Sequence, residues 1–567
     1  MSAHEPSEAT PQGLRAALAV YLERRTLAML ALGFASGLPF LLIFDTLSAW
    51  LREAGLSLAV IGFFSLATLA YSFKFLWAPL IDRTAVPGLT TLFGHRRSWM
   101  LVCQGLIIAG LWLIAGQDPA ANLPAMALIA VGVGFAGATQ DIVMDAWRIE
   151  AAELAKQGAM AAAYQWGYRI AMIVAGAAPL ILADRYGWGF SYAVMAALMA
   201  VGVAGVLAAP RERAHALRPI RVGATGQPRA IALAEWLARL TILGAGALAM
   251  GCGLAGDATL LAAALDALGA PDQGAALAEA WSAQPDGAWL QLAGVAVGLG
   301  LVVLAAWPIP GVETAPGAYL SQAFGEPLAD FFKRFAGGAG LILALICLYR
   351  LSDFVLNIMN PFYLDLGFGK TEIAEVRKVF GVAMSLLGVL AGGVVVARFG
   401  LMRALVIGAF AGPASNLVFA WLATRGPELG ALFVAIGVDN LASGFAGTAL
   451  IAYMSSLTSA GFTATQYALF SSLYALPGRL IASQSGRIVE GAARSAEDNV
   501  LFAPLEALFA GLPPEAFAAG AAKVLVAPAA LGSGYVVFFL YSTAIGLFAI
   551  VLAFLVARQG VKAARAP

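Results

Sequence analysis

The sequence predicts an all-α integral membrane protein with two six-helix bundles and two extra transmembrane helices between them, 14 spans in all. Hydrophobic residues make up 61% of the 567 residues, charged residues only 12%, and mean hydropathy is +0.82. A soluble protein is about 45–50% apolar and about 25% charged. This composition excludes a cytosolic enzyme and a nucleic-acid-binding protein, and the net charge of +1 indicates no polyanionic partner.

The second observation is the pattern of apolar stretches, because a helix needs about 20 such residues to cross a bilayer. Fourteen stretches are long enough, in the order six, two, six. They are 26–51, 58–81, 98–115, 123–145, 160–183, 188–208, then 240–265 and 288–307, then 341–366, 372–397, 401–424, 429–457, 465–490 and 532–556. We expect an N-terminal bundle over 1–209, linkers with the two added helices over 210–336, and a C-terminal bundle over 337–567.

The third observation is the distribution of lysine and arginine, which favour cytoplasmic loops. The linker 210–239 is rich in arginine, whereas the loop 266–287 between the added helices holds only acidic charges. Both termini are therefore predicted to be cytoplasmic. The apolar insertion 491–531 then lies outside, and we expect it to rest on the membrane surface.

Cysteine and histidine chemistry is not expected. The three cysteines are far apart in apolar runs, and the three histidines fall in polar segments. These spacings predict no disulfide framework, no metal site and no cofactor. Proton chemistry inside the membrane would then depend on carboxylates.

A short motif occurs twice, which supports an internal repeat. The chain reads APLIDR and then FGHRR between residues 78 and 97, and GGVVVARFGLMR over 392–403. Both resemble the cytoplasmic loop motif of the major facilitator superfamily. The resemblance implies that Asp82 caps a neighbouring helix N-terminus and that Arg83, Arg96 and Arg97 clamp a cytoplasmic gate. We expect Asp145 to close the gate with one of these arginines. Simple anchoring by positive charge is the alternative.

Longer blocks in both halves resemble the AmpG-type muropeptide permeases of that superfamily. They are GFASGLPF (33–40), IGFFSLATLAYSFKFLWAPLIDR (61–83), ATQDIVMDAWR (138–148), YRLSD (349–353), VDNLASGFAG (438–447) and FTATQYAL (462–469). The resemblance implies proton-coupled import of anhydromuropeptides, which are GlcNAc-anhydroMurNAc peptides, from periplasm to cytoplasm of a Gram-negative cell. Such import serves peptidoglycan recycling and β-lactamase induction. We expect a monomer in the lipid bilayer that binds this anionic sugar-peptide and protons.

Charged residues inside predicted spans are costly, so each is a candidate functional residue. At about 1.5 Å per residue, five lie near the middle of the membrane: Arg169, Arg350, Asp353, Asp439 and Arg479. Three arginines against two aspartates suit an anionic ligand, because guanidinium binds carboxylate bidentately. Since arginine keeps its proton, the proton carriers are expected among Asp353, Asp439 and Asp141. Alternatively, Arg350 and Asp353 only pair with each other.

Other residues complete the predicted substrate site. Gln140 suits sugar hydroxyl or acetamide groups, and Trp166 and Tyr168 are suited to stacking on sugar rings, although aromatic helix packing is an equal alternative. We also expect Lys74, in the cytoplasmic third of its span, and Asp45, near the periplasmic mouth, to belong to the substrate site.

The alternatives to muropeptide import are transport of another anionic solute, such as acetyl-CoA or a peptide, and a membrane enzyme. An enzyme would need paired catalytic acids or a histidine cluster, and neither is evident. The added helices nearly lack ionisable residues, so they are expected to face lipid outside the core. Asp257 is the exception, expected against the core or in a water-accessible pocket.

Overall fold

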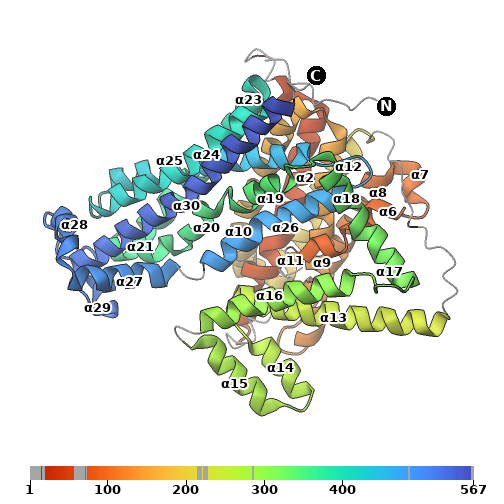
Figure 1. The fold of residues 1–567 in the computed structure, drawn as a ribbon, viewed down its shortest axis with the longest axis horizontal. Helices are drawn as coiled ribbons and strands as arrows, with labels where there is room; N and C mark the ends of the chain where they lie inside the picture. Colours follow the sequence, from red (N-terminus) through yellow and green to blue (C-terminus); the bar gives the residue numbers. More distant parts are fainter. Residues whose placement is uncertain are drawn as a thin grey trace.

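The computed structural model describes residues 15, 19–55, 71, 73–212, 220, 228–283, 287–482 and 485–563. Every regular element within these ranges is a helix. Eleven of the described helices are long and apolar enough to cross a membrane, or twelve if one bent pair counts as a single span. The all-helical membrane fold is therefore confirmed (Figure 1). The predicted count of fourteen spans is not confirmed.

Three predicted spans account for the difference in count. The second, 58–81, lies mainly outside the described residues, which include only its end as η4 (Lys74–Leu76) and α6 (Ala78–Arg83). The thirteenth corresponds to α26 (Thr463–Ala482), which is not among the eleven apolar helices. The ninth is broken at Arg350, and its pieces are α19 (Ala339–Leu348), α20 (Leu351–Val355), η6 (Leu356–Ile358) and α21 (Met359–Leu366).

The first half of the chain forms one bundle. Its elements are η1 (Val20–Leu22), α2 (Arg24–Leu41), η2 (Leu42–Thr46), α3 (Leu47–Glu53), α7 (Leu89–Phe93), α8 (His95–Ala115), α9 (Leu123–Ala151), α10 (Leu154–Tyr186), α11 (Trp188–Leu198) and α12 (Ala200–Ala208), besides η4 and α6. Their apolar side chains share one buried cluster, which includes Met29 and Trp147. Helices α2 and α10 pack closely because a methyl group at Gly33 or Gly167 would collide with the opposing backbone.

The second half forms the other bundle. Besides the elements already given, it contains α22 (Lys370–Glu375), the π-helical η7 (Val376–Gly381), α23 (Val382–Phe399), α24 (Leu401–Ala423), α25 (Leu429–Ser456), α27 (Ser485–Asp498) and α30 (Pro528–Ala563). The two bundles meet where α10 packs against α23. There the Trp166 indole N–H donates to the Leu386 carbonyl oxygen at 3.0 Å.

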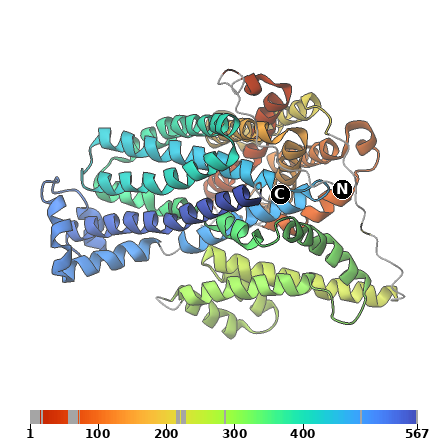
Figure 2. The same cartoon turned by 45° about the horizontal axis from the view of Figure 1, so that its top comes forward.

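The two added helices, α13 (Arg229–Ala255) and α16 (Gly287–Ala306), lie side by side outside the two bundles (Figure 2). At one end they are joined by α14 (Thr259–Ala267) and α15 (Pro271–Ser282). Met250 and Val302 of the pair contact Phe73 of the first half. Many of the pair's other large apolar side chains are exposed, as expected of helices that face lipid.

The position of α13 corrects the prediction for this span. The helix begins at Arg229 rather than at residue 240, because Arg239 is neutralised inside the pair. Arg239 pairs with Glu235 at 2.8 Å and donates to the carbonyl oxygens of Ala305 and Trp307, at 2.7 and 2.8 Å. The helix also ends at Ala255 rather than at residue 265. Asp257 therefore lies after the helix, exposed and not against the core, and accepts hydrogen bonds from Thr259.

The insertion 491–531 packs onto one end of the C-terminal bundle, and its expected place on the membrane surface stays a prediction. Figure 1 shows α28 (Ala503–Glu506) and α29 (Ala518–Val524) at the end of the C-terminal bundle, together with α27. Phe509 and Phe517 are buried in the same apolar cluster as Tyr535 of α30. The Phe517 backbone N–H donates to the carbonyl oxygen of Asp365 at 2.6 Å. Part of the insertion's apolar surface thus packs onto the protein, whereas Val500, Leu501 and Leu525 are exposed.

A linker segment crosses between the bundles before α19. It consists of α17 (Ala315–Leu320), the π-helical η5 (Ser321–Gly325) and α18 (Glu326–Arg334), which we call the strap. The chain bends by 107° between the strap and the helices α19 and α20. Thr314 caps the start of the strap and also donates to Glu235 of α13 at 2.8 Å. The strap is thereby attached to the added pair.

Candidate functional site

A cavity of about 890 Å³ lies between the two bundles, lined mainly by the second. Four of the five predicted central charges line it: Arg169 on α10, Arg350 and Asp353 on the broken ninth span, and Asp439 on α25. Tyr474 of α26 lines it as well. Arg479 lies on the same helix, but its side chain falls outside the described part of the structure.

Arg350 and Asp353 form an ion pair within the cavity. The Arg350 Nε and Nη2 atoms lie 2.9 and 2.7 Å from one carboxylate oxygen, and Nη2 also donates to the Ser443 hydroxyl at 2.6 Å. Arg350 stands at the break, directly before α20, and Asp353 lies three residues later in the first turn of that helix. Their charges cancel, so the alternative of mutual pairing holds for Arg350.

Asp439 and Arg169 have different surroundings from this pair. Asp439 accepts a hydrogen bond from the Ser415 hydroxyl at 3.2 Å, and no cation lies within salt-bridge distance of it among the described residues. Within the same part of the chain, no ion pair involves Arg169. The cavity therefore contains a carboxylate bound by a hydroxyl group and a guanidinium not neutralised by an adjacent acid.

Two further cations line the cavity, Lys370 of α22 and Arg377 of η7. The sequence interpretation missed them because it placed Lys370 in a loop and did not assign a face to Arg377. The sequence did contain a signal for them, since Lys370, Ala374 and Arg377 are spaced so that they share one face of a helix.

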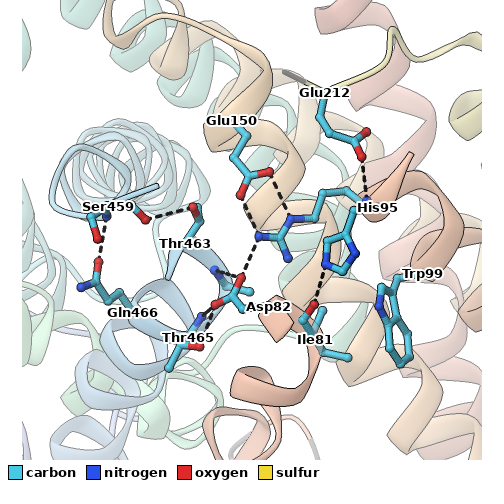
Figure 3. Close-up of polar contacts among 12 residues, drawn as sticks. Ile81, Asp82, His95, Trp99, Glu150, Glu212, Ser459, Thr463, Thr465 and Gln466 are labelled. Carbon is cyan, nitrogen blue, oxygen red and sulfur yellow. Dashed lines mark hydrogen bonds and ion pairs between the residues drawn. The ribbon is translucent and has the colours of Figure 1, made fainter. Parts of the chain in front are cut away.

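Apart from the cavity residues, Asp82 joins the two bundles directly (Figure 3). Its carboxylate accepts from the backbone N–H groups of Ala464 and Thr465, at 3.2 and 2.8 Å, and from the Thr465 hydroxyl at 2.7 Å. These residues form the first turn of α26. Asp82 thus caps a helix of the opposite bundle, at the positive end of its dipole.

Arg96 completes this contact. It is fully buried and lies 2.7 Å from Asp82 and 2.7 Å from Glu150 of α9. We call the end of the molecule that contains Asp82, Arg96 and Glu150 the interlocked end. Arg97 is not part of it, in contrast to the prediction, because its guanidinium lies over the Phe93 ring and near the Leu207 carbonyl.

Asp145 has other partners than those predicted. It lies 3.3 Å from Arg148 and 4.0 Å from Lys74, whereas Glu150, further along α9, contacts Arg96. Arg148 reaches across the bundles and donates to the Ser455 hydroxyl at 2.9 Å. Lys74 therefore pairs with Asp145 and does not line the cavity.

The strap adds a third layer at the interlocked end. Arg83 donates to the Gln322 carbonyl at 2.6 Å and pairs with Glu326 at 3.1 Å. On the other side, Asp330 accepts from the Ser459 hydroxyl at 2.7 Å and the Gln466 amide at 3.0 Å. The strap thus contacts both bundles.

Asp141 and Gln140 lie inside the first bundle, away from the cavity lining. The Ser36 hydroxyl donates to Asp141 and lies 2.7 Å from the Tyr164 hydroxyl. Gln140 is fully buried and donates to the Ala35 carbonyl at 2.9 Å, because α9 turns this side chain toward α2. It therefore does not reach the cavity floor.

The remaining predicted residues are spread over the first bundle. Trp166 binds the Leu386 carbonyl of α23, so helix packing explains it. The Tyr168 ring lies 6.2 Å from the Tyr164 ring, centroid to centroid, and does not line the cavity. Asp45 is exposed in η2, a π-helical turn of the first span.

The described residues contain no group of three or more histidine, cysteine, aspartate or glutamate side chains that could hold a metal ion. The cavity residues are suited to binding a charged solute by hydrogen bonds and ion pairs.

Comparison with known proteins identifies the family. Residues 85–482 match the Major Facilitator Superfamily, and residues 26–122 match the family described as Acetyl-coenzyme A transporter 1. The anhydromuropeptide permease of Escherichia coli K12 is 31% identical over 83% of this chain and 76% of its own length. The putative transporter AmpG 4 of Rickettsia felis is 28% identical, over 83% and 91%. The chain therefore belongs to the AmpG family of the major facilitator superfamily and is a multi-pass membrane transporter, not an enzyme.

Proposed function

We propose that this transporter is a proton-coupled importer of anhydromuropeptides in the inner membrane of a Gram-negative cell. It carries GlcNAc-anhydroMurNAc peptides from periplasm to cytoplasm, where they feed peptidoglycan recycling and β-lactamase induction. The names of the E. coli and Rickettsia relatives support this substrate and this family role. In this proposal the chain acts as a monomer, with both termini cytoplasmic and with bundles over 1–209 and 337–567 flanking the linker region 210–336.

The main support for the proposal is the position of Arg169. It lies in the cavity, and no described acid forms an ion pair with it, whereas Arg350 is already engaged by Asp353. The peptide part of a muropeptide carries carboxylates, which guanidinium groups bind through paired hydrogen bonds. Arg479, on the corresponding helix of the other bundle, is proposed as a second such ligand.

Proton coupling is assigned to Asp439, Asp353 and Asp141. Protonation of Asp353 would disrupt its ion pair with Arg350, which links proton uptake to the cation available for the substrate. Asp439 has only a serine among its described hydrogen-bond partners and can exchange a proton without breaking an ion pair. Asp141 also accepts a hydrogen bond from a serine, Ser36, but inside the first bundle rather than on the cavity.

The direction of access follows from the two ends of the molecule. On α25, Ser455 belongs to the interlocked end, and Ser443 and Ile436 line the cavity 12 and 19 residues earlier, about 18 and 28 Å along the helix. Lys370 and Arg377, also on the cavity, are exposed. In this proposal the interlocked end is a closed cytoplasmic gate, and the protein faces the periplasm.

Substitution of Arg169 by lysine tests the proposal. Lysine keeps the charge but loses the bidentate fork. We expect uptake of labelled anhydromuropeptide into proteoliposomes with an imposed pH gradient to fall about tenfold, the equivalent of about 1.4 kcal/mol. Uptake of the peptide-free disaccharide should fall less. The matched control is Arg425→Lys, an exposed arginine outside the cavity that lies over Trp421. Equal losses for both ligands would assign Arg169 a structural role.

A second candidate is transport of another anionic solute, such as acetyl-CoA or a peptide. It is favoured by the match of residues 26–122 to an acetyl-coenzyme A transporter family. Competition distinguishes the two, because excess unlabelled acetyl-CoA should suppress uptake of labelled anhydromuropeptide only if acetyl-CoA is also a substrate.

A further inference from the structure

Lys370 and Arg377 form a second layer of positive charge in the cavity, separate from Arg169 and Arg350. They project from α22 and η7, with Ile373 and Ala374 lining the cavity between them. Residues spaced by three, four and seven positions share one helical face, so the lysine and the arginine point to the same space. Both side chains are exposed, which places them where the cavity meets solvent.

The Arg377 guanidinium is held in position without being neutralised. It lies over the ring of the buried Tyr363, 5.7 Å from the centroid, and donates to the side-chain oxygen of Asn360. Both partners are uncharged, so the arginine keeps its full charge and part of its hydrogen-bonding capacity for a ligand. A guanidinium stacked on an aromatic ring also loses less rotational freedom when it binds an anion.

No acid is paired with these two cations among the described residues. The neighbouring Glu372 carboxylate accepts the Gly369 backbone N–H at 2.8 Å, as part of the start of α22. Asp439 is the carboxylate that lines the same cavity without an arginine in ion-pair contact. The inner Arg350, by contrast, is neutralised by Asp353. The positive charges at the mouth of the cavity are therefore less compensated by acidic groups than those deeper inside.

The two layers are separated along the cavity. Arg350 donates to Ser443 of α25, whereas Ile373, between Lys370 and Arg377, belongs to the same apolar cluster as Ile436, seven residues or about 10 Å further along α25. A ligand that contacts both layers must be elongated and must carry anionic groups at more than one place. A sugar head with a peptide stem has this shape and this distribution of carboxylates.

We propose that Lys370 and Arg377, with Asn360 and Tyr363, form an outer anion site that binds the distal carboxylates of the substrate's peptide stem. Arg169 binds a carboxylate of the stem closer to the sugar, and the sugar part lies deeper. This inference rests on the proposed function and adds a determinant of preference for peptide-bearing over peptide-free ligands. The outer site makes no contact that is needed to bind the disaccharide itself.

The test uses the full-length protein in proteoliposomes and two labelled probes, GlcNAc-anhydroMurNAc and the same disaccharide carrying a tripeptide. For Arg377→Gln we expect the apparent affinity for the tripeptide form to fall about tenfold, the loss of a charge-assisted hydrogen bond. The loss for the peptide-free disaccharide should be at least fivefold smaller. A tripeptide probe with amidated carboxylates should bind wild type and variant alike. Arg377→Lys should restore part of the affinity.

Arg425→Gln is the matched control, because Arg425 also lies over an aromatic ring, 5.4 Å from the Trp421 centroid, but outside the cavity lining. It should leave both affinities unchanged. Retained uptake of the peptide-free disaccharide by Arg377→Gln reports correct folding. Equal losses for both probes, or no loss for either, would overturn the outer site while leaving muropeptide import intact. Failure of the wild-type protein to bind either probe would overturn both proposals.

Discussion

At the scale of single residues, the carboxylates of the cavity differ in what protonation would break. Asp353 is fixed by Arg350 at 2.7 Å, whereas Asp439 accepts a hydrogen bond from the Ser415 hydroxyl at 3.2 Å. A serine can hydrogen-bond either form of a carboxyl group, because its hydroxyl both donates and accepts. Asp439 is therefore the residue best placed to exchange a proton while its surroundings stay intact.

Asp439→Asn is expected to abolish accumulation driven by a pH gradient, because asparagine cannot carry the proton. Counterflow exchange, in which labelled and unlabelled substrate move without net proton flux, should be retained. Both are measured in proteoliposomes. Glu428→Gln, an exposed acid at the start of the same helix, is the control and should behave as wild type. Normal accumulation by Asp439→Asn would exclude it as the proton carrier.

At the scale of helices, the two bundles are linked by the capping of α26 by Asp82. The carboxylate and its partner Arg96 are both fully buried. Asp82→Asn removes the negative charge that accepts three hydrogen bonds from α26, and a hydrogen bond to a charged group contributes about 1.5–3 kcal/mol. Arg96 keeps Glu150 as a partner. The pair between Arg83 and Glu326 is weaker by comparison, since the Glu326 side chain is 49% exposed and such pairs contribute about 0–1 kcal/mol.

Asp82→Asn should accordingly open the interlocked end. We expect the population with the bundles separated there to rise by more than tenfold, since each 1.4 kcal/mol is a factor of ten. Distances between spin labels on α9 and α25 at that end report the change. Glu326→Gln and Arg97→Gln should have small effects, because neither takes part in the buried contact. An unchanged distance distribution in Asp82→Asn would show that other contacts hold the end closed.

The strap is the element that sequence patterns describe least. Its residues contact Arg83 of one bundle and Ser459 and Gln466 of the other. The sequence predicts only that these residues belong to the linker region 210–336, and their partners depend on how the bundles are placed around them. A local pattern contains no information about that placement.

At the scale of the whole molecule, the added pair α13 and α16 lies outside the bundles, and none of its described residues lines the cavity. Deletion of residues 229–307, with a flexible linker between the flanking segments, should therefore retain muropeptide uptake at lower expression. The boundary differs from that suggested by hydropathy because α13 begins at Arg229.

The deletion removes Glu235, which binds Thr314 at the start of the strap, so a modest loss of stability is expected. A hydrogen bond of this kind contributes about 0.5–1.5 kcal/mol. Thermal unfolding in detergent measures this loss. A well-folded deletion variant that binds no labelled anhydromuropeptide would instead assign the pair a role in the site.

The sequence by itself determined that this is a helical membrane transporter, and it placed the ends of α8, α16 and α24 within a few residues. These properties depend on local sums of hydropathy and on motifs read along the chain. The two mid-membrane arginines on the cavity, Arg169 and Arg350, were found in the same way, by the cost of charge in an apolar span.

Only the tertiary structure decided which charges meet. Glu150 rather than Asp145 binds Arg96, and Arg377 faces the cavity, because the rotation and the neighbours of each helix set its contacts. Gln140 turns into the first bundle for the same reason. Hydropathy is summed over neighbours in the chain, whereas ion pairs form between groups that packing brings within a few ångströms.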